Sequence, residues 1–463
     1  MPDFLWSLHY RLFKGIEFPG IHQKLRNISN ESQLSTSEWK ELRNQNLRNL
    51  LIFAANNVPY YQMVFKQTGF DPHRAKLPDE MIRLPILTKS TVRHNTPQLI
   101  AQPARKSHMF ENATGGSTGR PLRFFQDTNY KTTGAALDAY VRAWWNIKPY
   151  DRTALVWGED REFYDMSLRE RFYRWRSRKR SLNAFRMNHE TLHEFCRMLN
   201  RWRPPYLMGY ASALEALAKC AKDNGINTLK FRAIQSTAEV LYPHQRTQIE
   251  EAFNTPVYNF YGSRESSNLA AECPEHRNLH LISTWRYVEI IDEKGRSVQE
   301  GEPGYIVLTD LSNYAMPFIR YRNEDIARLT HKPCLCGRPS PILKDLLGRS
   351  TDIIYTPRGH IIHGEYFTHL FYGRDDIRQF QIRQTALNRL VVRYVPLGDP
   401  PVQYMRQVAA KIRSTMGEEV TIDIELCTDI PVPRSGKRCF TISDIDPKDF
   451  PISKATKHSS HIP

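Results

Sequence analysis

The sequence predicts an α/β protein: a large N-terminal domain built around a mainly parallel sheet, with an antiparallel β subdomain, and a small α+β C-terminal domain. Three observations carry this expectation. Short apolar strands alternate with helical segments between residues 130 and 262. Two strands separated by glycine turns follow at 287–311, as in hairpins. A second strand–helix–strand pattern begins after residue 352. We therefore expect an N-terminal domain at 1–348, a mobile C-terminal domain at 349–450 and a disordered tail at 451–463.

Length and composition support a multidomain globular protein. A chain of 463 residues exceeds what one hydrophobic core usually supports, and 40% of its residues are hydrophobic. No apolar run has the length of a membrane span, and the N-terminus does not resemble a secretory signal. Seven scattered cysteines do not suggest a disulfide framework. We therefore expect a cytoplasmic protein without a membrane span.

The positive charge of the chain is compatible with several kinds of binding partner. The net charge is +16, but basic residues are spread along the chain with acids between them, so we do not expect nucleic-acid binding. One basic run, at 171–180, contains aromatic residues. It is either a solvated helix face or a site for an anionic substrate, for the phosphates of a carrier, or for an anionic membrane surface.

Residues 1 to about 60 are expected to be helical. Residues 1 to about 60 show mixed helical spacing of apolar side chains and stop at Asn56 and Asn57. A short apolar link at 84–89 leads to a helix cap at Thr88 or Ser90. A further helix is expected over 130–145.

Four predicted strands end in polar or aromatic residues. They cover 154–158, 206–210, 233–239 and 257–262, and a helix over 212–222 follows the second. Because ligands gather at the carboxyl ends of parallel strands, we expect a substrate pocket there. The candidate pocket residues are Trp157, Tyr210, Ser236, Thr237, Ala238 and Glu239. The two aromatic residues are equally compatible with a place in the core.

The C-terminal domain is predicted to be a small sheet with one helix. Its strands are expected at 379–382, 391–395 and 421–425, and its helix at 402–415.

A glycine-rich stretch at 114–121 is the most distinctive segment. Glycine lets the backbone approach an anion closely, hydroxyl side chains add donors, and Arg120 adds a charge that suits phosphate oxygens. The spacing is neither that of a Walker A loop nor that of a Rossmann loop. The stretch therefore predicts a phosphate-binding loop of another kind, with an ordinary surface turn as the alternative. Its candidate phosphate ligands are Thr114, Gly115, Gly116, Ser117, Thr118 and Gly119.

Two groups of soft ligands lie about sixty residues apart. Cys273, His276 and His280 form the first, and Cys334 and Cys336 form the second. Such residues suit a tetrahedral structural Zn²⁺. Free thiols in a reducing cell are the alternative.

Five motifs occur in the order found in adenylate-forming enzymes, and the chain resembles that superfamily over roughly residues 80 to 445. They lie at 114–121, 261–265, 321–325, 348–352 and 433–437. Within the superfamily, residues 315–322 and the Cys-x-Cys-Gly-Arg at 334–338 resemble the phenylacetate–CoA ligase family. The stretch 209–215 is similar to its CapK-like branch.

The resemblance implies roles for particular residues. The loop would hold the departing phosphates, Glu265 would carry Mg²⁺, Asp325 would bind the ribose and Tyr261 would stack on adenine. Lys437 would bridge the carboxylate and the α-phosphate during adenylation, with Glu265 and Arg120 as the other catalytic residues. A hinge at Asp352 would then admit the acceptor. For zinc, the family pattern favours His280 over His276. The remaining candidate nucleotide-binding residues are Ser236, Glu239, Tyr258, Asn259, Phe260, Gly262, Ser263 and Arg349.

The implied function is ATP-dependent activation of a carboxylic acid as an acyl-adenylate, with transfer to CoA. The implied cofactors are ATP, Mg²⁺, CoA and a structural Zn²⁺. An amine or hydroxyl acceptor, in polysaccharide or secondary-metabolite biosynthesis, stays open, as do the identity of the acid and a homodimeric state. Two alternatives belong to other classes: a nucleotide-binding protein without turnover, and a charge-driven nucleic-acid or membrane-surface protein.

Overall fold

A computed structural model describes most of the chain. The described residues are 3–102, 109–114, 122–157, 178–184, 187–275, 278–349, 353–357, 361–363, 366–367, 370–371, 374, 376–431 and 440–445. The expected tail at 451–463, most of the glycine-rich loop and most of the basic run lie outside them. The chain divides into two compact units. The first comprises Met1–Val288, Val307–Arg322 and Leu329–Lys344, and the second comprises Glu289–Ile306, Asn323–Arg328 and Asp345–Pro463.

Helices dominate the first 60 residues, as predicted, and further short helices follow up to Leu99. The longest, α3, begins after Ser35, whose side chain accepts a hydrogen bond from the Glu38 backbone in a capping box, and it ends at Asn57. Thr88 caps α5 by accepting from the Thr91 backbone. No helix in the described part of the chain is long and apolar enough to cross a bilayer. The elements are α1 (Asp3–Glu17), α2 (Ile21–Asn30), η1 (Glu31–Gln33), α3 (Thr36–Asn57), α4 (Pro59–Thr68), η2 (Asp79–Arg83), α5 (Lys89–His94) and α6 (Thr96–Leu99).

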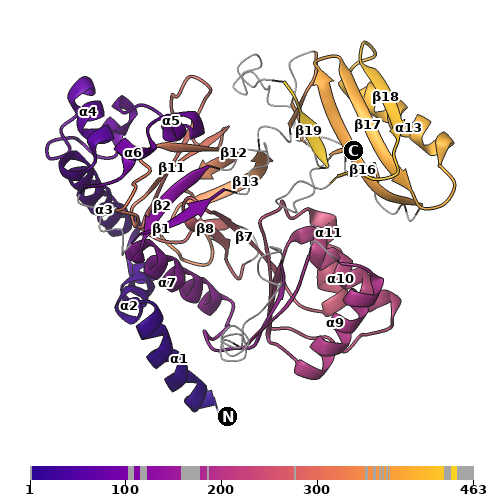
Figure 1. Cartoon of the computed structure of the whole chain (residues 1–463), viewed down its shortest axis with the longest axis horizontal. Helices are drawn as coiled ribbons and strands as arrows, with labels where there is room; N and C mark the ends of the chain where they lie inside the picture. Colours follow the sequence, from indigo (N-terminus) through magenta and orange to yellow (C-terminus); the bar gives the residue numbers. More distant parts are fainter. Residues whose placement is uncertain are drawn as a thin grey trace. The chain divides into compact units, whose positions relative to one another are not determined.

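The first unit contains a strand–helix alternation that follows the sequence pattern closely (Figure 1). Strands β3, β4, β5, β6 and β7 pair in parallel. Helices α9, α10 and α11 connect β4 to β5, β5 to β6 and β6 to β7. The elements are β1 (Met109–Ala113), β2 (Arg123–Asp127), α7 (Thr128–Trp144), β3 (Thr153–Val156), β4 (Lys179–Leu182), α9 (His189–Trp202), β5 (Tyr206–Gly209), α10 (Ala211–Asp223), β6 (Ala233–Thr237), α11 (Pro243–Phe253) and β7 (Val257–Ser263).

Alternate residues of the parallel strands face two separate cores. Leu207, Ile234 and Val257 pack with α9, α10 and α11, which lie together in Figure 1. Their neighbours Tyr206 and Ala233 pack on the opposite face, with α2 and α7. Successive side chains of a strand point to opposite faces, so a sheet covered by helices on both sides needs apolar residues throughout. This explains why the strands appear as continuous apolar runs.

The parallel strands continue into an antiparallel extension. Short apolar strands separated by glycine turns predicted a hairpin at 287–311, and strands β10 and β11 are neighbours in the sheet there. The large sheet has the order β10-β11-β12-β13-β9-β8-β7-β6-β5-β3-β4. Its remaining strands are β8 (Ser267–Glu272), β9 (Leu279–Leu281), β10 (Arg286–Ile291), β11 (Pro303–Asp310), β12 (Tyr321–Thr330) and β13 (Ile342–Arg349).

The C-terminal part of the second unit has the predicted sheet and helix. Its four-stranded sheet has the order β18-β17-β16-β19, and α13 contributes Met405, Val408 and Ile412 to its core. The buried Gln384 side chain bonds the backbone N–H and C=O of Tyr355, which ties β14 to this sheet. The elements are β14 (Ile353–Tyr355), β15 (Ile361–His363), β16 (Ile377–Ala386), β17 (Arg389–Pro396), α13 (Val402–Met416), β18 (Thr421–Leu426) and β19 (Thr441–Ser443).

A buried carboxylate joins the N-terminal helices to the sheet region. Glu31 accepts hydrogen bonds from the Thr284 backbone (2.8 Å), from the Thr284 hydroxyl (3.0 Å) and from Ser283 (3.1 Å). Burial raises the pKa of Glu31 from 4.5 to about 7, against the opposing effect of these hydrogen bonds. The folded state therefore holds the Glu31 proton more tightly than the unfolded state does. Between these two pKa values, stability falls as pH rises.

We expect Glu31→Gln to remove this pH dependence. Relative to the native chain, the variant should gain up to about 3 kcal/mol of unfolding free energy between pH 5 and pH 8, because its buried group carries no charge. Urea unfolding of both chains at the two pH values measures this difference. A difference that stays constant between pH 5 and pH 8 would show that Glu31 is ionised in the folded protein throughout.

Candidate active site and metal centre

The predicted pocket residues meet at the carboxyl ends of β3, β5, β6 and β7. The strand register places Val156 beside Gly209, Gly209 beside Ser236 and Ser236 beside Asn259. The rings of Trp157 and Tyr210, which follow β3 and β5, lie 4.5 Å apart between centroids. Tyr210 is buried in the core, and Trp157 is half-buried against it. The parallel register thus brings together side chains that lie far apart in the sequence.

The segment after β6 contains strained backbone and a helix contact. Ala238 has φ 68°, a left-handed conformation that a residue with a Cβ rarely adopts. The Ser236 hydroxyl is buried without a hydrogen-bond partner among the described residues. Glu239 accepts a hydrogen bond from the backbone N–H of Ser212 (2.9 Å) in the first turn of α10, where a negative charge is favourable. Glu239 therefore anchors α10, a structural role that the sequence pattern did not predict.

Several further candidate nucleotide-binding residues lie in β7, and some of their side chains pack in the core. Tyr258 stacks on Trp145 with centroids 5.0 Å apart, and Phe260 lies in the same core. The Asn259 backbone N–H donates to Glu272 (2.7 Å). Tyr261 is also buried.

The turn that carries Glu265 depends on a close backbone approach. A Cβ added to Gly262 would lie 2.5 Å from the Ser267 carbonyl oxygen, so only glycine fits between β7 and β8. The Ser263 hydroxyl accepts from the Ser266 backbone (3.2 Å) and tightens the turn. Glu265 is buried, and its Oε1 accepts a hydrogen bond from the Tyr321 hydroxyl (3.0 Å). Tyr321 is held in turn by a β-bridge to Leu87.

The base of the glycine-rich loop is tied to the turn that carries Glu265. The two ends of the loop are joined, because Thr114 N–H donates to Leu122 O (3.0 Å) and Leu122 N–H donates to the Thr114 hydroxyl (3.0 Å). The flanking strands β1 and β2 pair with each other. From these strands and α7, Gln126 (2.8 Å) and Tyr130 (2.9 Å) both donate to the backbone oxygen of Arg264. The glycine-rich motif and the motif that contains Glu265 are more than 130 residues apart in the sequence. The hydrogen bonds to Arg264 O therefore hold the two motifs together.

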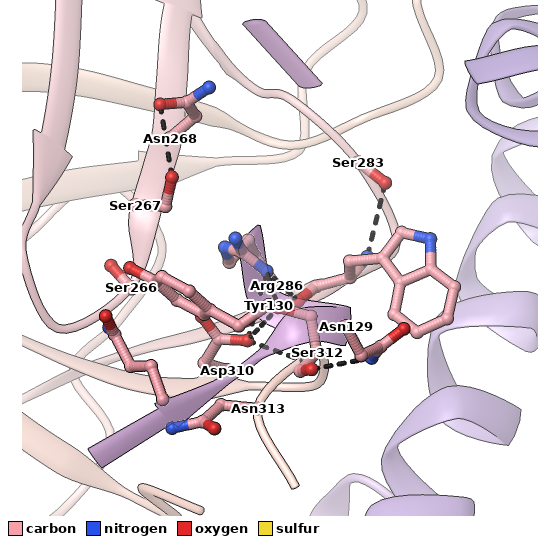
Figure 2. A network of polar contacts seen from close by, with 12 residues as sticks. Asn129, Tyr130, Ser266, Ser267, Asn268, Ser283, Arg286, Asp310, Ser312 and Asn313 are labelled. Atoms are coloured by element: carbon pink, nitrogen blue, oxygen red, sulfur yellow. Dashed lines mark hydrogen bonds and ion pairs between the residues drawn. The ribbon is translucent and has the colours of Figure 1, made fainter. Parts of the chain in front are cut away.

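A buried polar network lies beside this support (Figure 2). Arg286 Nη1 contacts Asp310 Oδ1 and the Ser312 hydroxyl, each at 3.2 Å, and Asn129 donates to Ser312 O at 2.6 Å. Burial raises the pKa of Asp310, and the Arg286 charge and two hydrogen bonds from Ser312 oppose that shift. Burial also raises the pKa of Tyr130, so its hydroxyl keeps the proton that it donates to Arg264 O. The network fixes the start of α7, which supplies Tyr130.

Asp325 lies in β12 and belongs to the second unit. Its Oδ2 accepts from the Asn323 side chain (3.1 Å), and its backbone N–H donates to Asn323 Oδ1 (3.1 Å). Glu324 between them has φ 72°. This local arrangement orients the Asp325 carboxylate. Arg349 ends β13, but its side chain lies outside the described residues, as do Gly115, Gly116, Ser117, Thr118, Gly119, Arg120, Asp352 and Lys437.

Four of the predicted soft ligands form one cluster. The ligand atoms of Cys273, His280, Cys334 and Cys336 all lie within 4.8 Å of one another. They come from the end of β8, from β9 and from the loop after β12, and His276 lies outside the described residues. Desolvation lowers the pKa of His280 to about 4, with a contribution from the Arg338 charge. The imidazole is therefore neutral at pH 7, the form that binds metals.

Sequence reasoning missed several residues that support the candidate site. Gln126, Tyr130 and Tyr321 each contact the Glu265 turn across long sequence separations. Tyr321 could have been predicted from the sequence, because it stands four residues before Asp325 in a recognised motif. No local signal pointed to Gln126 or Tyr130.

Comparisons with known proteins confirm the predicted resemblance. Residues 354–444 match the family described as the CapK C-terminal domain. Protein CapK of Staphylococcus aureus is 23% identical over 414 residues, which cover 88% of this chain and 89% of that protein. The phenylacetate-coenzyme A ligase of Thermus thermophilus is 23% identical over 327 residues, 69% of this chain and 72% of that protein.

A solved structure confirms the fold. The crystal structure of 2-hydroxyisobutyryl-CoA ligase in the postadenylation state has a TM-score of 0.71 and 20% identity, and it covers 90% of this chain and 91% of that one. An anthranilate CoA ligase in complex with anthranoyl-AMP has a TM-score of 0.53 and 15% identity, with 75% of this chain and 68% of that one covered. The chain is thus a relative of CapK and of the phenylacetate-coenzyme A ligases, and it has the fold of the adenylate-forming ligases.

Proposed function

We propose that this protein activates a carboxylic acid with ATP as an acyl-adenylate, releases pyrophosphate, and transfers the acyl group to CoA. The observation that carries the proposal is the pair of hydrogen bonds that Gln126 and Tyr130 donate to Arg264 O. These bonds join the strands and the helix next to the glycine-rich stretch to the turn that carries the buried Glu265 carboxylate, which supports the proposal. The named activities of the phenylacetate-coenzyme A ligases and of 2-hydroxyisobutyryl-CoA ligase support the same chemistry.

In the proposed reaction, particular residues have particular roles. A carboxylate oxygen of the acid attacks the α-phosphorus of ATP, and the bond to the β-phosphate oxygen breaks. The loop at 114–119 and Arg120 hold the leaving pyrophosphate. Tyr261 and Asp325 position the adenine and the ribose, and Lys437 contacts the acid and the α-phosphate. Such chemistry depends on positioning and charge stabilisation more than on covalent catalysis.

Glu265 is the candidate Mg²⁺ ligand. Its donor set fits the ion, because Mg²⁺ prefers one or two carboxylates together with phosphate oxygens. When bound, Mg²⁺ neutralises charge on the phosphates. Tyr321 holds one oxygen of Glu265 by a hydrogen bond and so fixes the direction of the carboxylate.

Product analysis tests the proposal and identifies the acceptor. The protein is incubated with ATP, Mg²⁺ and a panel of aryl, fatty and hydroxy acids, with and without CoA, and AMP and acyl products are measured by mass spectrometry. We expect AMP and an acyl-CoA thioester that both require one acid. An amide or ester formed only with an amine or hydroxyl acceptor would replace CoA in the proposal. ADP as the nucleotide product would contradict the proposal.

We also propose that Cys273, His280, Cys334 and Cys336 bind a structural Zn²⁺. Tetrahedral thiolates at about 2.3 Å from Zn²⁺ lie about 3.8 Å apart, and the Cys273 and Cys334 sulfurs are 3.8 Å apart. Cys336 Sγ lies 3.2 Å from His280 Nε2, and Ser340 Oγ lies 3.4 Å from His280 Nδ1, as expected of a partner that orients a ligand. With four protein ligands, the site leaves no position for a substrate, so its role is to hold β8 and β9 to the loop after β12.

We expect Cys336→Ser to lose the metal and to destabilise the first unit by at least about 3 kcal/mol, because metal binding adds directly to folding free energy. Metal content by mass spectrometry and the urea unfolding midpoint measure the two effects. Cys427→Ser, a thiol in the second unit, is the matched control and should change neither. A native chain that binds no zinc, or a Cys336→Ser chain that keeps it, would reject the site.

A further inference from the structure

Helix α9 begins with a His-Glu-x-x-His segment that no step of the proposed ligase chemistry uses. The segment starts at His189, the first residue of the helix, and ends at His193. Residues four apart in a helix lie on the same face, one turn above the other. The two imidazoles therefore leave α9 side by side. Two histidines at this spacing are the pair of nitrogen ligands that helices offer to metal ions.

The two rings are close and nearly parallel. Their centroids are 6.5 Å apart and their planes differ by 15°. His189 is exposed and His193 is half-buried. No hydrogen bond or ion pair holds either imidazole among the residues that the structure describes, so both rings are free to turn. A metal ion bound at about 2.0–2.1 Å from each ring needs the two nitrogens about 3 Å apart, which a small rotation of the side chains provides.

The backbone that carries the pair is fixed without a metal. The Asn188 side chain accepts a hydrogen bond from the Thr191 backbone (2.8 Å), and the Thr191 hydroxyl accepts one from the Asn188 backbone (3.0 Å). This capping box closes the first turn of α9. One turn further along, Phe195 and Leu199 anchor the helix in the core. The ligand spacing therefore exists before an ion binds, and binding requires only the ordering of two side chains.

The number of ligands distinguishes this pair from a catalytic zinc site. Catalytic zinc has three protein ligands and one open position. In the described part of the chain, the only close group of three or more potential metal ligands is the four-residue cluster proposed to bind Zn²⁺. The pair on α9 thus supplies two nitrogens, and water completes the coordination. Imidazole suits Zn²⁺, Ni²⁺ and Cu²⁺, whereas Mg²⁺ and Ca²⁺ prefer oxygen ligands.

We propose that His189 and His193 chelate a divalent transition-metal ion of the Zn²⁺, Ni²⁺ and Cu²⁺ class on the surface of α9. Once one nitrogen holds the ion, the helix keeps the second nearby at a high effective concentration, so the pair binds more tightly than two separate histidines. The bound ion bridges the first two turns of α9. This site shares no ligand with the proposed zinc cluster or with Glu265, and it does not depend on the ligase activity.

Calorimetric titration with Ni²⁺ tests the proposal. The full chain is first loaded with Zn²⁺ and desalted, so that the proposed zinc cluster is filled. We expect saturable binding of Ni²⁺ and no comparable binding of Mg²⁺ or Ca²⁺. His189→Gln and His193→Gln should each weaken Ni²⁺ binding about tenfold or more, because each leaves a single imidazole. Metal analysis should show as much tightly bound zinc in both variants as in the native chain.

Two matched variants separate chelation from histidine content. His193→Gln combined with Glu194→His keeps two histidines but places them five residues apart, on different sides of the helix. This variant should bind Ni²⁺ no better than the single-histidine variants. His73→Gln removes a lone exposed histidine and should leave the affinity within about twofold of the native value.

Several results would overturn the proposal. Ni²⁺ binding that survives the loss of either histidine, or that the five-residue spacing preserves, would remove the pair from the site. Equal affinity for Mg²⁺ would assign binding to carboxylates, and no Ni²⁺ binding by the native chain would reject the site outright. Pyrophosphate exchange without added Ni²⁺ should be unchanged in the histidine variants, so the ligase proposal is tested separately.

Discussion

Replacing Lys437 by alanine is expected to reduce carboxylate-dependent ATP–pyrophosphate exchange by about 10²- to 10³-fold, the largest effect that we predict. The reason is electrostatic. In the proposed reaction Lys437 bridges the acid and the α-phosphate, where negative charge concentrates in the transition state. Removing a preorganised donor from such a position typically costs about 3–4 kcal/mol. Exchange of labelled pyrophosphate into ATP, with saturating acid, measures the loss.

A second lysine of the same unit provides the matched control. Lys411 is an exposed residue of α13, and Lys411→Ala should leave exchange unchanged. A Lys437→Ala chain given presynthesised acyl-adenylate should still form the thioester, because the proposed role of Lys437 ends with adenylation. Exchange that survives in Lys437→Ala at the native rate would remove this residue from the mechanism.

Replacing Glu265 by glutamine is expected to lower kcat/KM for ATP by about 10²-fold and to raise the Mg²⁺ concentration needed for half-maximal activity. The amide is a much weaker ligand for a hard cation than a carboxylate is. The fold should survive, since the amide oxygen can still accept the Tyr321 hydrogen bond. Initial rates over a Mg²⁺ titration separate the two effects.

Tyr321→Phe shows how much of this effect comes from orientation. It removes the hydrogen bond to Glu265 but leaves the carboxylate, so we expect a loss of about five- to tenfold, corresponding to about 1–1.4 kcal/mol. Native activity and an unchanged Mg²⁺ requirement in Glu265→Gln would contradict the assignment of this residue.

The sequence predicted the parallel part of the fold well because its signals are local. Strands β5 and β6 are buried on both faces, so each appears as an apolar run that a helix follows. Strands β4 and β1 did not stand out. Three of the four residues of β4 are polar, and β4 is a strand only through its pairing with β3. β1 has a polar centre and pairs with β2 across the glycine-rich loop. Such segments become strands because they pair with a neighbouring strand, so their own residue pattern does not predict them.

The candidate site was predictable where its chemistry is concentrated in short motifs. Short motifs that can be recognised in the sequence contain the glycines at 115, 116 and 119, Glu265 and the four soft ligands. Their supports were not predictable, because Gln126 and Tyr130 reach Arg264 across 138 and 134 residues. A hydrogen bond of this kind depends on the fold and leaves no periodic signal. The same holds for the hydrogen bond that Glu239 accepts from the Ser212 backbone in the first turn of α10.

The most direct test of the ligase proposal is ATP–pyrophosphate exchange by the native chain with a panel of aryl, fatty, hydroxy and amino acids. Exchange measures the reversible formation of an acyl-adenylate and requires no acceptor. We predict exchange that depends on Mg²⁺ and on one class of acid. No exchange with any acid, together with thermal stabilisation by ATP and Mg²⁺, would contradict the account and leave a protein that binds nucleotide without activating an acid.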